Sequence, residues 1–361
     1  MAFSRARKAF LLLAIALAGP ALLGPALSGP ALLGSALAAP PAFDIGVVYW
    51  SMAISGQVAM RQGLEREAAR LNREAPQRPF RLHPVVGGDG ETGIHTQRQA
   101  MYRFIGKRMD AIILQPIDSA ALSQPVQAAN QARIPVFAYD QYVLDGKLDC
   151  YVTSNNHLAG YLDGEYVAHR FHDRQTPLRL VIVEFPYVSS TVERVEGFRD
   201  ALHDAKRPYT IVGRYRAVEP VSGRQAGRTI LKNHPRGTLD AIFCVNDGGG
   251  HAVMETLKQA GRDDVVMATV DGDPRMIAEI RRGGIVGIDT AQFMGALGAE
   301  AMRMTARKLE GRRVPRQVLV TVFPITRENL DAYPGWEGPI PATIRKPWAP
   351  DERVPGNQVT W

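Results

Sequence analysis

The sequence predicts an α/β protein with two doubly wound, Rossmann-like lobes, each built on a parallel sheet. From residue 44 onward, short runs rich in β-branched residues alternate with amphipathic stretches, which is the pattern of parallel βαβ units. The alternation runs over 45–139, breaks around 145–156 and resumes over 180–288. A chain of 361 residues, 45% hydrophobic and 22% charged, is also long enough for two domains of ordinary size.

Each half of the chain supplies its own set of strands and helices, with apolar residues at helical spacing between the strands. In the first half we expect strands at 45–49, 80–86, 111–114 and 136–139, and helices at 58–71, 96–106 and 119–132. In the second half we expect strands at 180–183, 210–215, 241–245, 265–270 and 285–288, and helices at 192–205, 222–233, 251–260 and 274–281. A long helix at 294–309 and a strand at 317–322 complete the regular part.

Residues 1–38 have the features of a cleaved export signal. A basic start is followed by an apolar stretch from Phe10 and by small residues at the end, in Ala36-Leu37-Ala38. Prolines recur within the stretch and would interrupt a membrane-spanning helix. We therefore expect export and a soluble, extracytoplasmic mature protein.

The charge of the chain indicates no nucleic-acid partner. The formal net charge of +7 falls by three, to +4, when Arg5, Arg7 and Lys8 leave with the signal, and the remaining basic residues are scattered along the sequence.

We expect neither a metal nor a cofactor. His169 and His172 are three residues apart on a predicted helix but have no third ligand nearby. Residues 88–93 match a dinucleotide-binding fingerprint, yet two acidic residues inside that loop would repel a pyrophosphate. Cys150 and Cys244 fall at or in strands of different parts of the chain, and a free buried cysteine behaves as a small hydrophobic residue, so we expect no disulfide between them.

Polar side chains follow the ends of the predicted strands in both halves. In open parallel sheets, ligand groups gather at the carboxyl ends of the strands. A carboxylate accepts hydrogen bonds from hydroxyls, and an amide both donates and accepts, so both suit a hydroxyl-rich ligand. These polar strand ends include Gln115, Asp140, Gln141, Asn246, Asp271 and Gln292.

Five motifs in order give the sequence a recognisable likeness. They are ILQPIDSAALSQPVQAANQARIPVFAYD, ERVEGFRDAL, FCVNDGGGHAV, VDGDPRM and GGIVGIDTAQ. On these motifs the chain resembles the periplasmic sugar-binding proteins of ABC transporters, in the ribose/galactose-binding class, over about residues 44–330.

The resemblance implies the type I periplasmic binding protein fold, in which the chain crosses a hinge three times. The crossings would lie near 152–156, 289–293 and 322–326. The N-terminal lobe would comprise 42–154 plus 293–322, and the C-terminal lobe 155–292 plus 323–335. Residues 336–361 would form a Pro/Trp-rich C-terminal extension.

The resemblance also implies site residues and partners. It implies ligand contacts from Gln115, Asp140, Asn246, Asp271 and Gln292, and we expect further contacts from Gln141, Trp50, Ser51, Tyr187 and Arg194. The protein would be a monomer without enzymatic activity that captures a small-molecule ligand and delivers it to the membrane subunits of an ABC transporter.

Some positions depart from the family pattern. The loop at 53–57 lacks the aromatic residues that sandwich a sugar ring, and Gln141 and Val192 stand where arginines are usual. The site is therefore more acidic than a ribose pocket, and the expected ligand is a sugar, a polyol or a sugar derivative, with an amine-bearing compound left open.

Two other functions also stay open. One is a periplasmic sensor of the same fold that signals to a membrane histidine kinase or chemoreceptor. The other is an exported glycosidase-like enzyme that uses Asp140 and Asp271 as an acid/base pair.

Overall fold

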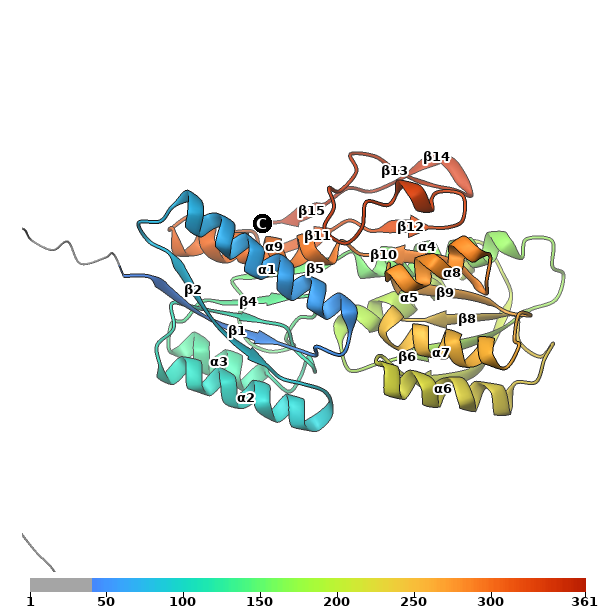
Figure 1. Ribbon diagram of the computed structural model, residues 1–361, viewed down its shortest axis with the longest axis horizontal. Helices are drawn as coiled ribbons and strands as arrows, with labels where there is room; N and C mark the ends of the chain where they lie inside the picture. The colour runs from blue at the N-terminus through green and yellow to red at the C-terminus, as the bar shows by residue number, and fades with distance from the viewer. Residues whose placement is uncertain (1–40) are drawn as a thin grey trace, which may run out of the picture. The chain divides into compact units, whose positions relative to one another are not determined.

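The computed structural model describes residues 41–361, so the export signal expected at 1–38 lies outside the described residues. The described chain forms two large sheets and one two-stranded sheet, with helices packed on both faces of each large sheet (Figure 1). Among the described helices, none is long and apolar enough to cross a membrane.

The first large sheet has the strand order β15-β11-β5-β4-β3-β1-β2. Neighbouring strands are parallel except for the β11–β15 pair. Helices α1 and α9 cover one face, and α2 and α3 cover the other. The strands are β1 (Phe43–Tyr49), β2 (Phe80–Val86), β3 (Ala111–Leu114), β4 (Val136–Tyr139), β5 (Cys150–Ser154), β11 (Gln317–Val320) and β15 (Gln358–Thr360), and the helices are α1 (Ser55–Glu74), α2 (Gly90–Gly106), α3 (Ser123–Gln131) and α9 (Met294–Leu309).

The second large sheet has the order β12-β10-β9-β8-β6-β7, in which only β12 is antiparallel to its neighbour. Helices α4 and α5 pack together, as do α6 and α7, with α8 beside α7. The strands are β6 (Leu178–Glu184), β7 (Tyr209–Arg216), β8 (Ala241–Cys244), β9 (Val266–Asp271), β10 (Val286–Ala291) and β12 (Phe323–Ile325), and the helices are α4 (Asn156–Arg170), α5 (Ser189–Asp204), α6 (Pro220–Asn233), α7 (Asp247–Gln259) and α8 (Pro274–Arg282). Two α/β lobes with mostly parallel sheets confirm the predicted fold class.

Strand β5 and helix α4 occupy a region where the sequence pattern suggested a break. Helix α4 contains Gly160 and Gly164, which lower its helix propensity and hide the amphipathic pattern. The structure gives these glycines a packing role, because a Cβ on Gly160 would collide with the backbone carbonyl of Arg194 on α5. This close contact between α4 and α5 helps to set the position from which the Arg194 side chain extends into the space between the lobes.

The last part of the chain, residues 333–361, is called the C-terminal strap below. It begins after the short 3-10 helix η1 (Leu330–Ala332) and first contacts residues near the ends of β9 and β10. The indole Nε1 of Trp336 donates to the carbonyl oxygen of Asp271 at 2.7 Å. The carbonyl oxygen of Trp336 accepts from the backbone N–H of Gly295, in α9, at 3.0 Å. This one residue therefore bonds to both lobes.

The strap then makes a second pair of contacts with the two lobes (Figure 1). Its hairpin, formed by β13 (Ile344–Lys346) and β14 (Ala349–Val354), places Lys346 Nζ 2.9 Å from Glu165 of α4 and the Trp348 ring 5.6 Å from that of Tyr166. Strand β15 next returns to the first sheet and pairs with β11, covering what would be an open sheet edge.

Candidate ligand-binding site

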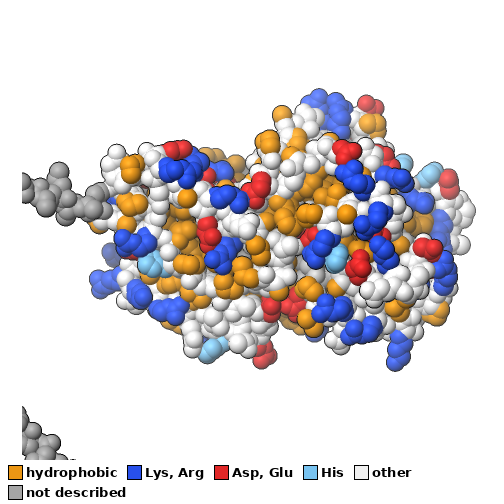
Figure 2. Space-filling view, in the orientation of Figure 1, with side chains coloured by type: hydrophobic (Ala, Val, Ile, Leu, Met, Phe, Trp, Pro, Cys, Tyr) orange, Lys and Arg blue, Asp and Glu red, His pale blue; other side chains and the backbone are white. Residues whose placement is uncertain are grey.

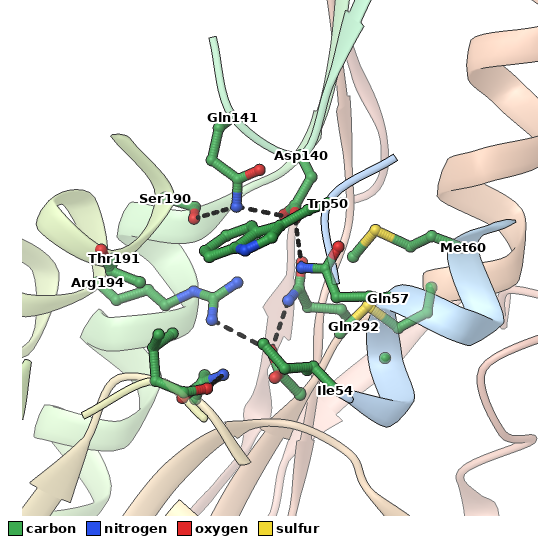
Figure 3. A pocket seen from close by; sticks show the side chains of 15 residues that line it. Trp50, Ile54, Gln57, Met60, Asp140, Gln141, Ser190, Thr191, Arg194 and Gln292 are labelled. Atoms are coloured by element: carbon green, nitrogen blue, oxygen red, sulfur yellow. Dashed lines mark hydrogen bonds and ion pairs between the residues drawn. The ribbon is translucent and has the colours of Figure 1, made fainter. Parts of the chain in front are cut away.

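A small cavity lies where loops and helix starts from the two lobes meet (Figure 3). Its volume is about 20 Å³, room for roughly one water. Sites for drug-sized ligands are typically about 300–1,000 Å³, so a small organic ligand can enter only if the lobes separate or side chains move. The lining residues are Trp50, Ile54, Gly56, Gln57, Met60, Asp140, Gln141, Ser190, Thr191, Arg194, Val218, Asn246, Asp271, Gln292 and Met294.

Asp140, directly after β4, presents a carboxylate from the first lobe. Its φ of 65° lies in the left-handed region, which non-glycine residues rarely adopt. The Oδ2 atom accepts from the side-chain amides of Gln115 and Gln141, both at 2.8 Å, and of Gln57 at 3.4 Å. Burial raises the pKa of this carboxyl, although Arg194 and the three amides oppose the rise.

Asp271, the last residue of β9, presents a carboxylate from the second lobe. Its φ of 140° is again positive, so both lobes end a central strand in an aspartate with an uncommon backbone conformation. Its Oδ1 accepts from Gln292 at 2.7 Å and from Arg194 at 3.1 Å. Burial raises the pKa of the Asp271 carboxyl to about 6, with the Arg194 guanidinium acting in the opposite direction.

Arg194 projects from α5 into the same space with only 3% of its surface exposed. Its Nε donates to the side chain of Asn156 at 2.9 Å, and one terminal nitrogen donates to both Asp271 and the carbonyl oxygen of Val245, the latter at 2.7 Å. These bonds hold the guanidinium in place before any ligand enters. Arg194 is also the only cationic residue that lines the cavity among the described residues.

Three further carboxyl groups are buried behind Asp271. Asp247 accepts from the hydroxyl of Thr269 at 2.7 Å, Asp163 from that of Thr290 at 2.6 Å, and Asp289 from the backbone N–H of Gly272 at 2.9 Å. Burial raises the pKa of each of the three well above the ordinary aspartate value. The second lobe therefore has an excess of buried acid behind the cavity.

Seven of the ten residues expected at the site line the cavity: Trp50, Asp140, Gln141, Arg194, Asn246, Asp271 and Gln292. Asn246 also caps α7, accepting from Gly249 N at 3.2 Å, and donates to the carbonyl oxygen of Val218 at 3.0 Å. Trp50 leans against Phe185, with 6.2 Å between ring centroids.

The other three expected residues lie elsewhere. Gln115 lies behind Asp140 and supports it, and Ser51 is buried with its hydroxyl accepting from the backbone N–H of Ala53. Tyr187 is 42% exposed and lines two pockets outside the cavity, because the β6–α5 loop that carries it ends nearer the surface.

Several lining residues were not identified from the sequence. Gln57, Ser190 and Thr191 are polar, and Ile54, Met60, Val218 and Met294 supply apolar walls where an aromatic platform was noted as missing. Gln57 lies in the loop region singled out for that missing platform, and Met294 follows Gln292 by two residues. Proximity to a strand end was the available signal in both cases.

The histidine pair considered for metal binding and the two cysteines do not line the cavity. His169 and His172 stack with ring centroids 5.7 Å apart, and no group of three potential metal ligands occurs among residues 41–361. Cys150 and Cys244 are free and buried.

Comparison with known proteins places the chain among binding proteins. The family model described as "Periplasmic binding protein domain" matches residues 45–313. The chain is 27% identical to the ribose import binding protein RbsB of Escherichia coli over 71% of this chain and 81% of that protein. It is 24% identical to the xylitol-binding protein of Mycolicibacterium smegmatis, over 68% of this chain and 70% of that protein.

Solved structures share the fold. The Caulobacter myo-inositol binding protein bound to myo-inositol superimposes with a TM-score of 0.71 at 22% identity, covering 80% of this chain and 95% of that one.

Proposed function

Because the chain belongs to the periplasmic binding protein domain family, we propose that it captures a small polyhydroxylated ligand, a sugar, a polyol or a derivative of either, between its lobes. The protein with its ligand bound then delivers the ligand to the membrane subunits of an ABC transporter. The relatives named above are binding proteins, and we propose no enzymatic activity. A periplasmic location and a monomeric state belong to the same proposal.

The pairing of two aspartates across the cavity carries this proposal. Asp140 comes from the first lobe and Asp271 from the second, and both line one space. A ligand that bonds to both carboxylates stabilises the closed arrangement in proportion to its preference for that arrangement over the open one. Hinge closure needs no covalent step.

The proposed lobes are residues 42–154 plus 293–322 and residues 155–292 plus 323–335. The strand membership of the two large sheets supports this division, since β5 and β11 lie in the first sheet and β6, β10 and β12 in the second. The residues proposed to contact the ligand are the seven expected ones that line the cavity, with Gln57 added.

A nucleic-acid partner is not proposed. On the face seen in Figure 2, lysine and arginine side chains are interspersed with acidic ones and form no continuous basic surface.

The function is tested by a thermal-shift screen of the purified protein against pentoses, hexoses, polyols and cyclitols. A ligand present at 100 times its dissociation constant adds about 2.7 kcal/mol to the free energy of unfolding. We expect a hit that both Asp140→Asn and Asp271→Asn abolish or weaken. Asp118→Asn is the matched control, because Asp118 caps the start of the segment at 120–121 outside the cavity. A hit that survives in both cavity variants would contradict the proposed site.

A further inference from the structure

Three glutamine side chains in the cavity have a buried carbonyl oxygen without a hydrogen-bond donor. They are Gln57, Gln141 and Gln292, whose exposed fractions are 6%, 3% and 1%. In each, the Oε1 atom has no partner among the described residues. All three line the cavity, and Figure 3 shows them around the same space.

The aspartates explain why these oxygens point away from them. An ionised carboxylate can only accept hydrogen bonds, so a neighbouring amide must turn its nitrogen toward it. Gln57 and Gln141 donate to Asp140, and Gln292 donates to Asp271. The carbonyl oxygens are consequently left for another donor, and a buried acceptor without a donor costs free energy.

The charges in the cavity are also unequal. The ionisable residues of the lining are Asp140, Asp271 and Arg194, two acids against one base. Arg194 forms its ion pair with Asp271 at 3.1 Å. The Asp140 carboxylate receives hydrogen bonds only from neutral amides, although just 2% of the residue's surface is exposed. A buried carboxylate is costly unless a charge of opposite sign pairs with it.

We propose, on the basis of the binding function above, that the ligand is a polyhydroxylated compound carrying a protonated primary amine, bound beside Asp140. An ammonium group has three donors and one positive charge. Those donors match in number the Asp140 carboxylate and the carbonyl oxygens of Gln57 and Gln141. The hydroxyl groups of the ligand then face Asp271, Arg194 and the carbonyl oxygen of Gln292.

A neutral sugar meets these requirements less completely. A hydroxyl in place of the amine supplies one donor and no charge, so two of these three acceptors lack a donor and Asp140 gains no cationic partner from the ligand. The arrangement therefore selects an amine over a hydroxyl at this one position while leaving the rest of the ligand uncharged.

The test compares matched pairs of compounds by isothermal titration calorimetry on the purified protein at pH 7. The pairs are sorbitol with 1-amino-1-deoxysorbitol, glucose with glucosamine, and myo-inositol with its monoamino analogue. The N-acetyl form of each amine serves as the uncharged control. We expect one amine to bind about tenfold or more tightly than its hydroxyl partner, since close buried charge pairs are commonly worth at least that factor, and we expect N-acetylation to remove the gain.

The Asp140→Asn variant keeps the shape of the side chain, and asparagine tolerates a positive φ. It should weaken the amine more than its hydroxyl partner, so that the ratio of the two affinities falls to about one. Hydroxyl compounds that bind the unaltered protein as tightly as the amines would overturn the amine assignment and leave the proposed function standing. An amine preference that persists in Asp140→Asn would overturn the assignment to Asp140. No binding by any compound of either type would count against the proposed function itself, and the inference would fall with it.

Discussion

Asp271 should make the ligand-free protein more stable at pH 5 than at pH 8, by an amount that unfolding measurements can detect. The unfolded carboxyl releases its proton near its ordinary pKa of 3.8, whereas the folded one holds it until about pH 6. The folded state therefore binds more protons between these values, and stability declines as the pH rises through that window.

The size of the effect follows from the pKa difference. One pKa unit corresponds to about 1.4 kcal/mol, so ionised Asp271 costs the folded state roughly 3 kcal/mol at pH 8, and about half of this is regained at pH 5. Asp140, Asp163, Asp247 and Asp289 also have raised pKa values and act in the same direction. Arg262 lowers the pKa of Asp264 to about 2 against the effect of burial, and the stability it contributes is lost only below about pH 4.

The assay is urea unfolding of the unaltered protein and of Asp271→Asn at pH 5 and pH 8. Asparagine keeps the size of the side chain but cannot ionise. The difference in unfolding free energy between the two proteins should shift by about 1.5 kcal/mol between the two pH values, in favour of the variant at pH 8. A difference that is the same at both pH values, or one that favours the unaltered protein at pH 8, would refute this reasoning.

Three further predictions concern the support of the site and the C-terminal strap. Arg194→Met should lower the free energy of unfolding in urea by about 3–5 kcal/mol, because it leaves the buried Asp271 carboxylate without a cationic partner. Adding Asp271→Asn should recover part of this loss. If the losses of the two variants simply add, the pairing is contradicted. Trp336→Phe should lower the free energy of unfolding by about 1 kcal/mol and speed ligand release in stopped-flow measurements, because it removes the hydrogen-bond donor to the Asp271 carbonyl. Trp348→Phe should leave release unchanged, because the Nε1 atom of Trp348 has no partner in the described chain. A chain that ends at Asp331 should melt at a lower temperature in calorimetry, because it loses β15 and the contacts of Trp336 and Trp348; an unchanged melting temperature would remove the bracing role of the strap.

The sequence located the strand ends well, because buried parallel strands are short apolar runs with clear polar boundaries. Strands β3 and β4 begin and end where the pattern placed them, and Asp140 follows directly. The same reasoning placed Asp271 and Gln292 at the cavity. The strand ends of one parallel sheet share an edge, so a local pattern is enough to place a residue at the ligand-binding edge of its own sheet.

Contacts that depend on packing between elements were less accessible to sequence reasoning. Arg194 was expected at the site, but the close approach of α5 to α4 at Gly160, which helps to position it, is encoded by no local pattern. Gln57, in the first turn of α1, donates to Asp140 although the two residues are 83 positions apart in the chain. Trp336 was read as part of a proline-rich extension, and its bond to Asp271 joins residues 65 positions apart.

The hydrogen bond from Trp336 to Asp271 makes one part of the cavity depend on the end of the chain. The Asp271 carbonyl receives its donor from a tryptophan that follows both lobes in the chain, and β15 is the last strand of the first sheet in chain order. A chain shortened at its C-terminus by a protease could still form the two lobes but would lack the brace between them. The hydrogen bond that braces Asp271 therefore forms only in a chain that retains Trp336, so the support of this cavity residue depends on an intact C-terminal strap.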